Sequence, residues 1–294
     1  MNPSEKKDYT ALGLLLLLSL IWGTSFILIK QGLKVFAPDE LGALRVTSAF
    51  LFLLPVGIMK FKDLKPGDWH KLSISGLMGI FIPAFLFATA QTKIESSIAG
   101  ILNTLSPLFT MIMGALFFQS RFKGAAIVGI IVGFGGTVLL MISRSGGSVS
   151  GINYYALLVV LATALYGTNL NWVKAKLLHL GSLTITSVGL LFIGPLAALY
   201  LFGFSNFTDK MQQAPGAWAA LGFVALLGFM STSIATVLFN KLVKLTTPIY
   251  ASSVTYIMPI VSVMWGVLDG ESLFIGHFIG MGFIIGGVWL ANRK

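Results

Sequence analysis

The sequence is built from apolar segments of about 20 residues, each bounded by charges or turn residues. A segment of this length crosses the ~30 Å hydrocarbon layer of a membrane as a helix, and a helix satisfies its own backbone hydrogen bonds there. The mean hydropathy of +0.89 and the 10% of charged residues are typical of a membrane protein. We therefore predict an all-α membrane protein with ten transmembrane helices, at Ala11 to Ile29, Leu41 to Met59, Trp69 to Thr92, Ile98 to Phe118, Gly124 to Ile142, Tyr154 to Val173, Leu183 to Phe202, Trp218 to Asn240, Ile249 to Leu268 and Phe274 to Ala291.

The net charge of +10 comes from Lys and Arg residues that concentrate on one side of these predicted spans. Such a bias marks the cytoplasmic side of a membrane protein, so the N and C termini are both predicted to be cytoplasmic. The basic character then reflects topology and attraction to the anionic lipid bilayer. No nucleic-acid partner is expected.

Several stretches of the first half of the chain recur in the second half in the same order. IAGILNTLSPLFTMIMGALF, from Ile98, returns as YASSVTYIMPIVSVMWGV, from Tyr250. WGTS at Trp22 returns as YGTN at Tyr166, LGALRVTS returns as LGSLTITS, and PGDW returns as PGAW. Five helices are therefore followed by five similar helices.

The recurrence predicts two five-helix repeats, residues 1–146 and 147–294. Because five is odd, the two repeats must cross the membrane in opposite orientations, which is the inverted repeat of many secondary transporters. A duplication retained only for packing is the alternative. Inverted halves, however, supply the two equivalent conformations that alternating access needs.

These features resemble the EamA family of the drug/metabolite transporter superfamily. The resemblance lies in IWGTSFILIK in the first helix, an arginine early in the second (LGALRVTSAF), NTLSP and then GALFF in the fourth, and a glycine-rich fifth helix. It covers nearly the whole chain and implies a ten-helix fold that moves small metabolites such as amino acids, often outward. It implies no particular substrate. The resemblance to aromatic amino-acid exporters and plastidic phosphate antiporters holds only at the superfamily level.

Prolines at the middle of two equivalent spans indicate where a cavity lies. Pro107 and Pro259 have no backbone N–H, so the carbonyls four residues earlier, at Asn103 and Thr255, lose their helical donors. Small or polar residues share a face with each proline. We predict that both helices bend beside a cavity near the membrane midplane; close helix packing is the alternative for the glycines on these faces.

The expected depth of polar and aromatic side chains extends this prediction to two gates. An outer gate is expected on the first, third and fourth helices, and an inner gate on the sixth, eighth and ninth, with Gln91 and Asn240 as matched amides at their far ends. The predicted cavity and gate residues are Trp22, Thr24, Ser25, Arg45, Gln91, Asn103, Pro107, Tyr166, Asn169, Asn171, Trp172, Asn240, Thr255, Tyr256 and Pro259.

Arg45 is the one arginine or lysine that lies well inside a predicted span, and Thr184 is its counterpart in the second half. A charge at this depth costs several kcal/mol unless it reaches the interface or finds a partner. Three interpretations stay open. Arg45 extends to the outer interface or pairs with Asp39 or Glu40, it fixes the second helix, or it offers positive potential to a carboxylate substrate.

Chemistry-bearing groups are sparse in the spans. No Asp or Glu lies centrally in a predicted span, the three His residues are scattered near span ends, and the chain has no Cys. A P-loop and a Ser/His/Asp arrangement are also lacking. We therefore expect no catalytic residue, no metal site and no cofactor. A homodimer through the fifth and tenth helices is an expectation from their glycine pairs, for which packing within one chain is the alternative.

The sequence thus predicts a secondary transporter of the inner (plasma) membrane that moves a small amphiphilic metabolite, with amino-acid export expected. One rival is a membrane-embedded enzyme or a lipid-handling protein, which would need a convergent acid/base or metal cluster. A facilitative channel is the other.

Overall fold

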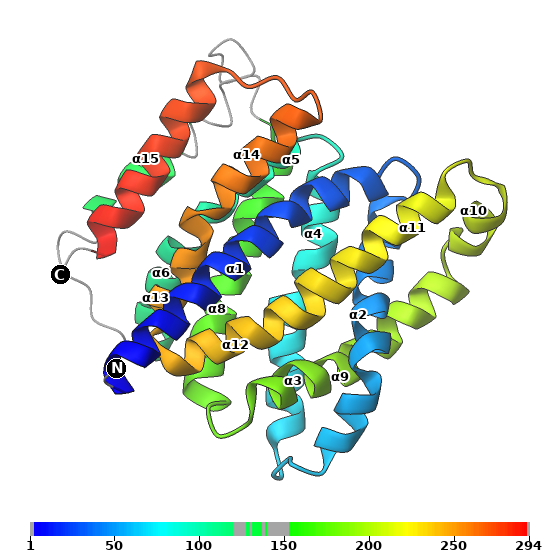
Figure 1. Cartoon of the computed structure of the whole chain (residues 1–294), viewed down its shortest axis with the longest axis horizontal. Coiled ribbons are helices and arrows are strands. Elements are labelled where there is room, and N and C mark those ends of the chain that lie inside the picture. Colours follow the sequence, from blue (N-terminus) through cyan, green and yellow to red (C-terminus); the bar gives the residue numbers. More distant parts are fainter. Residues whose placement is uncertain (1–2, 120–127, 130, 137–138, 140–152, 293–294) are drawn as a thin grey trace.

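The computed structural model of the protein describes residues 3–119, 128–129, 131–136, 139 and 153–292, and these residues form a bundle of helices (Figure 1). Its α-helices are α1 (Pro3–Gly32), α2 (Pro38–Phe61), α3 (Asp68–Gly76), α4 (Ile82–Ala90), α5 (Ser96–Leu102), α6 (Ser106–Phe118), α8 (Tyr155–Lys176), α9 (Ser182–Gly203), α10 (Phe207–Gln213), α11 (Ala217–Leu226), α12 (Ala235–Leu245), α13 (Pro248–Ser252), α14 (Met258–Leu268) and α15 (Ile275–Asn292).

Within the described ranges, eight continuous helical stretches are long and apolar enough to cross a membrane. They correspond to the predicted spans one to four and six to nine. The tenth predicted span forms α15, whose apolar part, Ile275–Gly287, is shorter. Most of the fifth, predicted at Gly124 to Ile142, lies outside the described residues, as does the loop that separates the predicted repeats. The protein is a multi-pass helical membrane protein.

Two pairs of spans contain turns that are not α-helical. The third span is interrupted by a π-helix, η1 (Leu77–Phe81), and the eighth by a longer one, η5 (Leu227–Ile234). The fourth contains a 3₁₀ turn, η2 (Asn103–Leu105), and the ninth another, η6 (Ser253–Tyr256). Each irregular turn therefore recurs at the equivalent span of the other half.

The turns that begin the third and eighth spans also match. Gly67 in PGDW has φ +86° and Gly216 in PGAW has φ +77°, a left-handed conformation that costs little only for glycine. This explains why both copies of the stretch place glycine directly before the helix.

Two glycines at corresponding positions of the two halves each allow a close contact between helices. A Cβ atom on Gly23 of α1 would lie 2.6 Å from Cβ of Val261 in α14, and one on Gly167 of α8 would lie 2.6 Å from the carbonyl carbon of Phe109 in α6. The first helix of each half thus packs closely against the proline-containing helix of the other half, α1 on α14 and α8 on α6.

Glycines also join α15 to the described part of the fifth predicted span. A Cβ on Gly136 would lie 2.7 Å from the Gly280 carbonyl oxygen, and one on Gly287 would lie 2.6 Å from the Gly129 carbonyl oxygen. These glycines pack within one chain. A Cβ on Gly282 would meet no atom of the described residues within 4 Å.

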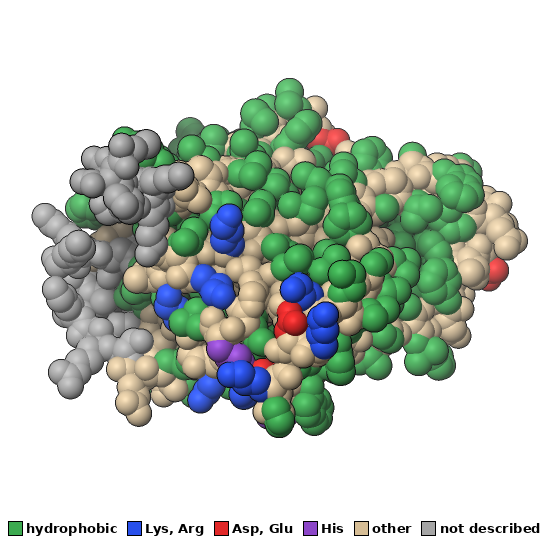
Figure 2. Space-filling view, turned by 60° about the horizontal axis from the view of Figure 1, so that its bottom comes forward, with side chains coloured by type: hydrophobic (Ala, Val, Ile, Leu, Met, Phe, Trp, Pro, Cys, Tyr) green, Lys and Arg blue, Asp and Glu red, His purple; other side chains and the backbone are tan. Residues whose placement is uncertain are grey.

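Basic side chains gather on one face of the molecule, at the lower side of Figure 1, whereas much of the remaining surface in view is hydrophobic (Figure 2). Asp68 at the start of α3 accepts contacts there from Lys71 at 3.2 Å and from the His179 Nε2 atom at 2.9 Å. Such a basic face fits the predicted cytoplasmic side.

Candidate functional site: a cavity between the two halves

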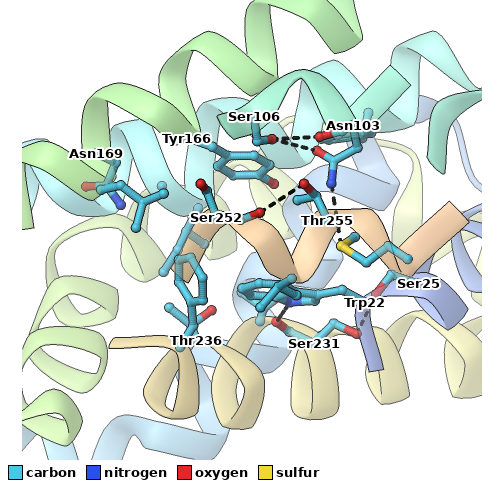
Figure 3. A pocket seen from close by; sticks show the side chains of 18 of the residues that line it. Trp22, Ser25, Asn103, Ser106, Tyr166, Asn169, Ser231, Thr236, Ser252 and Thr255 are labelled. Carbon is cyan, nitrogen blue, oxygen red and sulfur yellow. Dashed lines mark hydrogen bonds between the residues drawn. The ribbon is translucent and has the colours of Figure 1, made fainter. Parts of the chain in front are cut away.

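A cavity lies inside the bundle, and side chains from both halves of the chain line it (Figure 3). η1, η2, η5 and η6 all contribute lining residues. Irregular backbone at membrane depth is tolerated where it is buried in protein or lines a cavity, which accounts for this placement. The space between its lining atoms, open solvent included, is about 920 Å³. It brings together eight predicted site residues, Trp22, Ser25, Arg45, Asn103, Tyr166, Asn169, Asn240 and Thr255.

In the turn before each central proline, a side-chain hydroxyl donates to a backbone carbonyl three residues earlier. The Asn103 carbonyl, which Pro107 deprives of its helical donor, accepts a hydrogen bond from the Ser106 hydroxyl at 2.8 Å. In the second half, the Thr255 hydroxyl donates to the Ser252 carbonyl at 2.9 Å. Figure 3 shows the side chains of these serines, Asn103 and Thr255 around the same space.

One wall of the cavity joins α1 to η5. The Trp22 indole N–H donates to the backbone carbonyl of Ser231 at 2.9 Å, and the hydroxyls of Ser25 and Ser231 are 2.7 Å apart. The Trp22 ring packs edge-on against Phe239, with centroids 4.8 Å apart. The indole is therefore held by a hydrogen bond and by a ring contact.

The opposite wall joins α8 to the third span in a similar way. Asn169 accepts a hydrogen bond from the Ser75 hydroxyl at 2.8 Å, and a Cβ on Gly79 would lie 2.2 Å from the Asn169 amide nitrogen. The glycine in η1 thus makes room for this amide. Tyr166 stacks on Phe87 with centroids 6.0 Å apart.

Arg45 faces the cavity, and its Nε–H donates to the Thr232 hydroxyl at 2.8 Å. The two acids that precede it in α2 have other partners. Asp39 accepts a hydrogen bond from the Tyr200 hydroxyl, and Glu40 pairs with Lys210 at 2.6 Å.

The remaining predicted residues lie outside the cavity lining; they are Thr24, Gln91, Pro107, Asn171, Trp172, Tyr256 and Pro259. Asn171 is buried at the contact of α8 with α6, where its amide donates to the Thr110 carbonyl at 2.8 Å. The Trp172 indole donates to the Lys71 carbonyl at 3.1 Å and so ties α8 to α3.

Thr24 and Gln91 have different surroundings. The Thr24 hydroxyl accepts a hydrogen bond from the Trp265 indole at 3.1 Å, on the contact of α1 with α14. Gln91 is buried, and neither its amide nitrogen nor its amide oxygen has a hydrogen-bond partner within the part of the chain that the structure describes.

The polar residues of the eighth span were not among the predicted site residues. Ser231, Thr232 and Thr236 line the cavity from η5 and α12. Their signal was present, because STSIAT places hydroxyls one helical turn apart in an otherwise apolar segment. Ser106 and Ser252 near the central prolines were missed in the same way.

An ionic cluster lies at the end of the bundle where α1 and α14 finish. Lys30 contacts Asp269 at 2.7 Å and Glu271 at 2.9 Å. The Glu271 carboxylate also accepts hydrogen bonds from the backbone N–H and hydroxyl of both Ser96 and Ser97, at the start of α5. A carboxylate at a helix N-terminus satisfies N–H groups that have no helical acceptor.

The lysine equivalent to Lys30 lies at the opposite end of the bundle. Lys174, at the end of α8, donates to the backbone carbonyls of Val243 and Thr246 at 3.1 and 2.8 Å. These carbonyls lie at the C-terminal end of α12, where a cation is favourable.

The multi-pass helical bundle and the polar and aromatic cavity between its halves are the features of a membrane transporter. The sequence profile of the EamA-like transporter family matches residues 10–142 and again residues 153–293. The chain therefore belongs to the EamA-like transporter family, which confirms the resemblance found in the sequence.

Relatives cover nearly the full chain at low identity. An "Uncharacterized transporter" of Archaeoglobus fulgidus is 27% identical, with 93% of this chain and 95% of that one covered. The "Uncharacterized inner membrane transporter YedA" of Escherichia coli K12 is 25% identical, with 95% and 90% covered. A "Probable terminal-alkyne amino-acid exporter" of Streptantibioticus cattleyicolor is 22% identical, with 95% and 92% covered.

A solved crystal structure shares the fold with a TM-score of 0.64 at 20% identity, covering 97% of this chain and 96% of that one.

Proposed function

We propose that the protein is a secondary transporter of the inner membrane that moves a small amphiphilic metabolite, such as an amino acid, outward by alternating access. The observation that carries this proposal is one cavity lined by irregular segments from both halves of the chain. In transporters of inverted-repeat architecture, such discontinuous helices form the substrate site near the midplane.

Matched contacts support an inverted repeat. The Gly23–Val261 and Gly167–Phe109 approaches involve equivalent positions of the two halves. Exchanging the roles of the halves would convert one conformation into the other, so a cavity closed at one end becomes closed at the opposite end. In this scheme the contacts of Glu271 break when the cavity opens at one end, and the contacts of Lys174 break when it opens at the other.

The expected substrate class has two supports. The cavity combines aromatic side chains with hydroxyls, amides and a single guanidinium, which suits a molecule with a polar and an apolar part. The relative from Streptantibioticus cattleyicolor is named as a probable exporter of an amino acid.

Purified protein in proteoliposomes tests the function. Vesicles loaded with a mixture of unlabelled amino acids should take up the same labelled amino acids by saturable counterflow. Lack of flux for all amino acids and related metabolites would contradict the proposal. A conductance that does not saturate, in single-channel recording, would instead identify a channel.

Replacing Trp22 by Ala should slow counterflow about tenfold, because a hydrogen bond and an edge-on ring contact together contribute ~1–2 kcal/mol. Trp218→Ala is the matched control, since Trp218 is 75% exposed. It should transport like the wild type. Equal rates in Trp22→Ala and Trp218→Ala, at equal amounts of inserted protein, would remove Trp22 from the transport path.

A further inference from the structure

Arg45 occupies a costly position. It lies about 10 Å along α2 from the first residue of the helix, at 1.5 Å per residue. Its guanidinium faces the interior cavity. A charge within a membrane span is costly unless a partner or water compensates it, and such residues mark substrate or ion pathways.

The described part of the chain offers no counter-ion for this charge. Among the described residues, no Asp or Glu lies within 4.0 Å of the Arg45 guanidinium, since the ion pairs formed there involve other cations. Asp39 and Glu40 are engaged by Tyr200 and Lys210. None of the described side chains that line the cavity is acidic. The cavity therefore carries one positive charge that no acidic side chain among the described residues compensates.

The guanidinium is nevertheless held in place. Its Nε–H donates to Thr232 at 2.8 Å, and η5 lies so close to α2 that a Cβ on Gly228 would be 2.7 Å from the Arg45 carbonyl oxygen. A guanidinium has five N–H groups, and the paired ones fit the two oxygens of a carboxylate. With Nε fixed by Thr232, the terminal amino groups remain for a ligand.

We propose that Arg45 binds the carboxylate of the transported molecule. The ligand class is a monoanionic carboxylate with an apolar or aromatic body, which Trp22, Phe87 and Phe239 would contact. A phosphate monoester brings close to two negative charges and would leave one without a partner. The proposal rests on the transport function proposed above, and Arg45 is a specificity-determining residue for it.

Guanidinium labelling tests the binding site without knowledge of the substrate. Phenylglyoxal is added to the purified full chain in detergent, and modification of each arginine is followed by mass spectrometry. A mixture of the natural L-amino acids should slow labelling of Arg45 several-fold, whereas the corresponding amino-acid amides should not. Arginines elsewhere in the sequence serve as internal controls. Equal protection by acids and amides, or protection by neither, would overturn the proposal.

A thermal-unfolding comparison separates binding from a structural role. Without ligand, Arg45→Gln should unfold at the wild-type temperature or above it, because the substitution removes an uncompensated charge. A residue that fixes α2 would instead show a clear drop. Arg45→Lys keeps the charge but lacks the planar fork, so it should recover only part of the carboxylate binding.

Transport measurements distinguish a failure of the carboxylate site from a failure of the proposed transport function. In proteoliposomes, Arg45→Gln should raise the half-saturating concentration of the carboxylate substrate at least about tenfold, which is the scale of one charged contact. If the wild type and Arg45→Gln carry acids and amides equally well, the carboxylate site is refuted while transport stands. If the wild type carries neither, the proposed function itself fails.

Discussion

Replacing Glu271 by Gln should lower the free energy of unfolding by about 3 kcal/mol. The carboxylate is 1% exposed and lies 2.9 Å from Lys30, and it accepts the backbone N–H groups of Ser96 and Ser97 at 2.9 and 3.0 Å. A glutamine removes the charge and turns an NH₂ group toward groups that are themselves donors. Denaturant unfolding of the purified protein in one detergent measures the difference.

Asp269→Asn is the control for this substitution. Asp269 also contacts Lys30, at 2.7 Å, but its side chain is 24% exposed. Ion pairs open to solvent contribute at most ~1 kcal/mol, so this variant should lose far less stability. Similar losses in Asp269→Asn and Glu271→Gln would contradict the central position of Glu271 in the cluster.

The same carboxylate should make stability depend on pH. Burial raises the pKa of Glu271, but the hydrogen bonds from Ser96, Ser97 and Lys30 outweigh it and lower the pKa from 4.5 to about 2. A depressed folded-state pKa stabilises the protein above the unfolded-state value, and this stability is lost as the pH falls from about 4.5 toward 2. The wild type should therefore lose stability over this range, and Glu271→Gln should lack that component. Parallel pH profiles for the two proteins would exclude Glu271 as its source.

The length and polarity of the apolar segments made most spans predictable, because a membrane helix needs about 20 apolar residues. The breaks at Asn103 and Thr255 were predictable as well, since proline removes a defined hydrogen bond. The π-helices η1 and η5 were not. Pro83 follows η1 and removes the helical donor of the Gly79 carbonyl, but a proline alone does not specify a π-helix, and no proline lies near η5. Both π-helices occur where Gly79 meets Asn169 and Gly228 meets α2, which are contacts between segments far apart in sequence.

The depth of the site residues in the membrane was predictable from the sequence. The rotation of each helix about its axis, which decides the side chains that face the cavity, was not. Asn169 and Asn171 are two residues apart, which is about 200° around an α-helix, so only one of them can face a given neighbour. Asn169 lines the cavity and Asn171 packs on α6. Ser25 and Thr24 divide in the same way between η5 and α14. Which face of each helix turns inward depends on packing between helices, and hydropathy does not encode it.

Gly167→Ala should destabilise the protein by about 3 kcal/mol or more and abolish counterflow. The new Cβ would lie 2.6 Å from both the Phe109 carbonyl carbon and the Thr110 nitrogen. These are backbone atoms of α6, so relief requires α8 and α6 to move apart. Tyr166 and Ser106 line the cavity from these two helices, and such a shift would displace them relative to each other.

Two other glycine-to-alanine substitutions provide comparisons for the stability of Gly167→Ala. Gly222→Ala meets nothing within 4 Å and should be neutral or stabilising by ~0.5–1 kcal/mol, because alanine favours the helix. Gly23→Ala would meet the Val261 Cβ at 2.6 Å and the Met258 carbonyl oxygen at 3.0 Å. A Cβ is fixed to its own backbone, so relief requires α1 and α14 to move apart, and this variant should also lose stability. Unfolding measured in one detergent should show Gly222→Ala to be more stable than both Gly23→Ala and Gly167→Ala. A Gly167→Ala variant as stable as Gly222→Ala would show that α6 and α8 do not need this close approach.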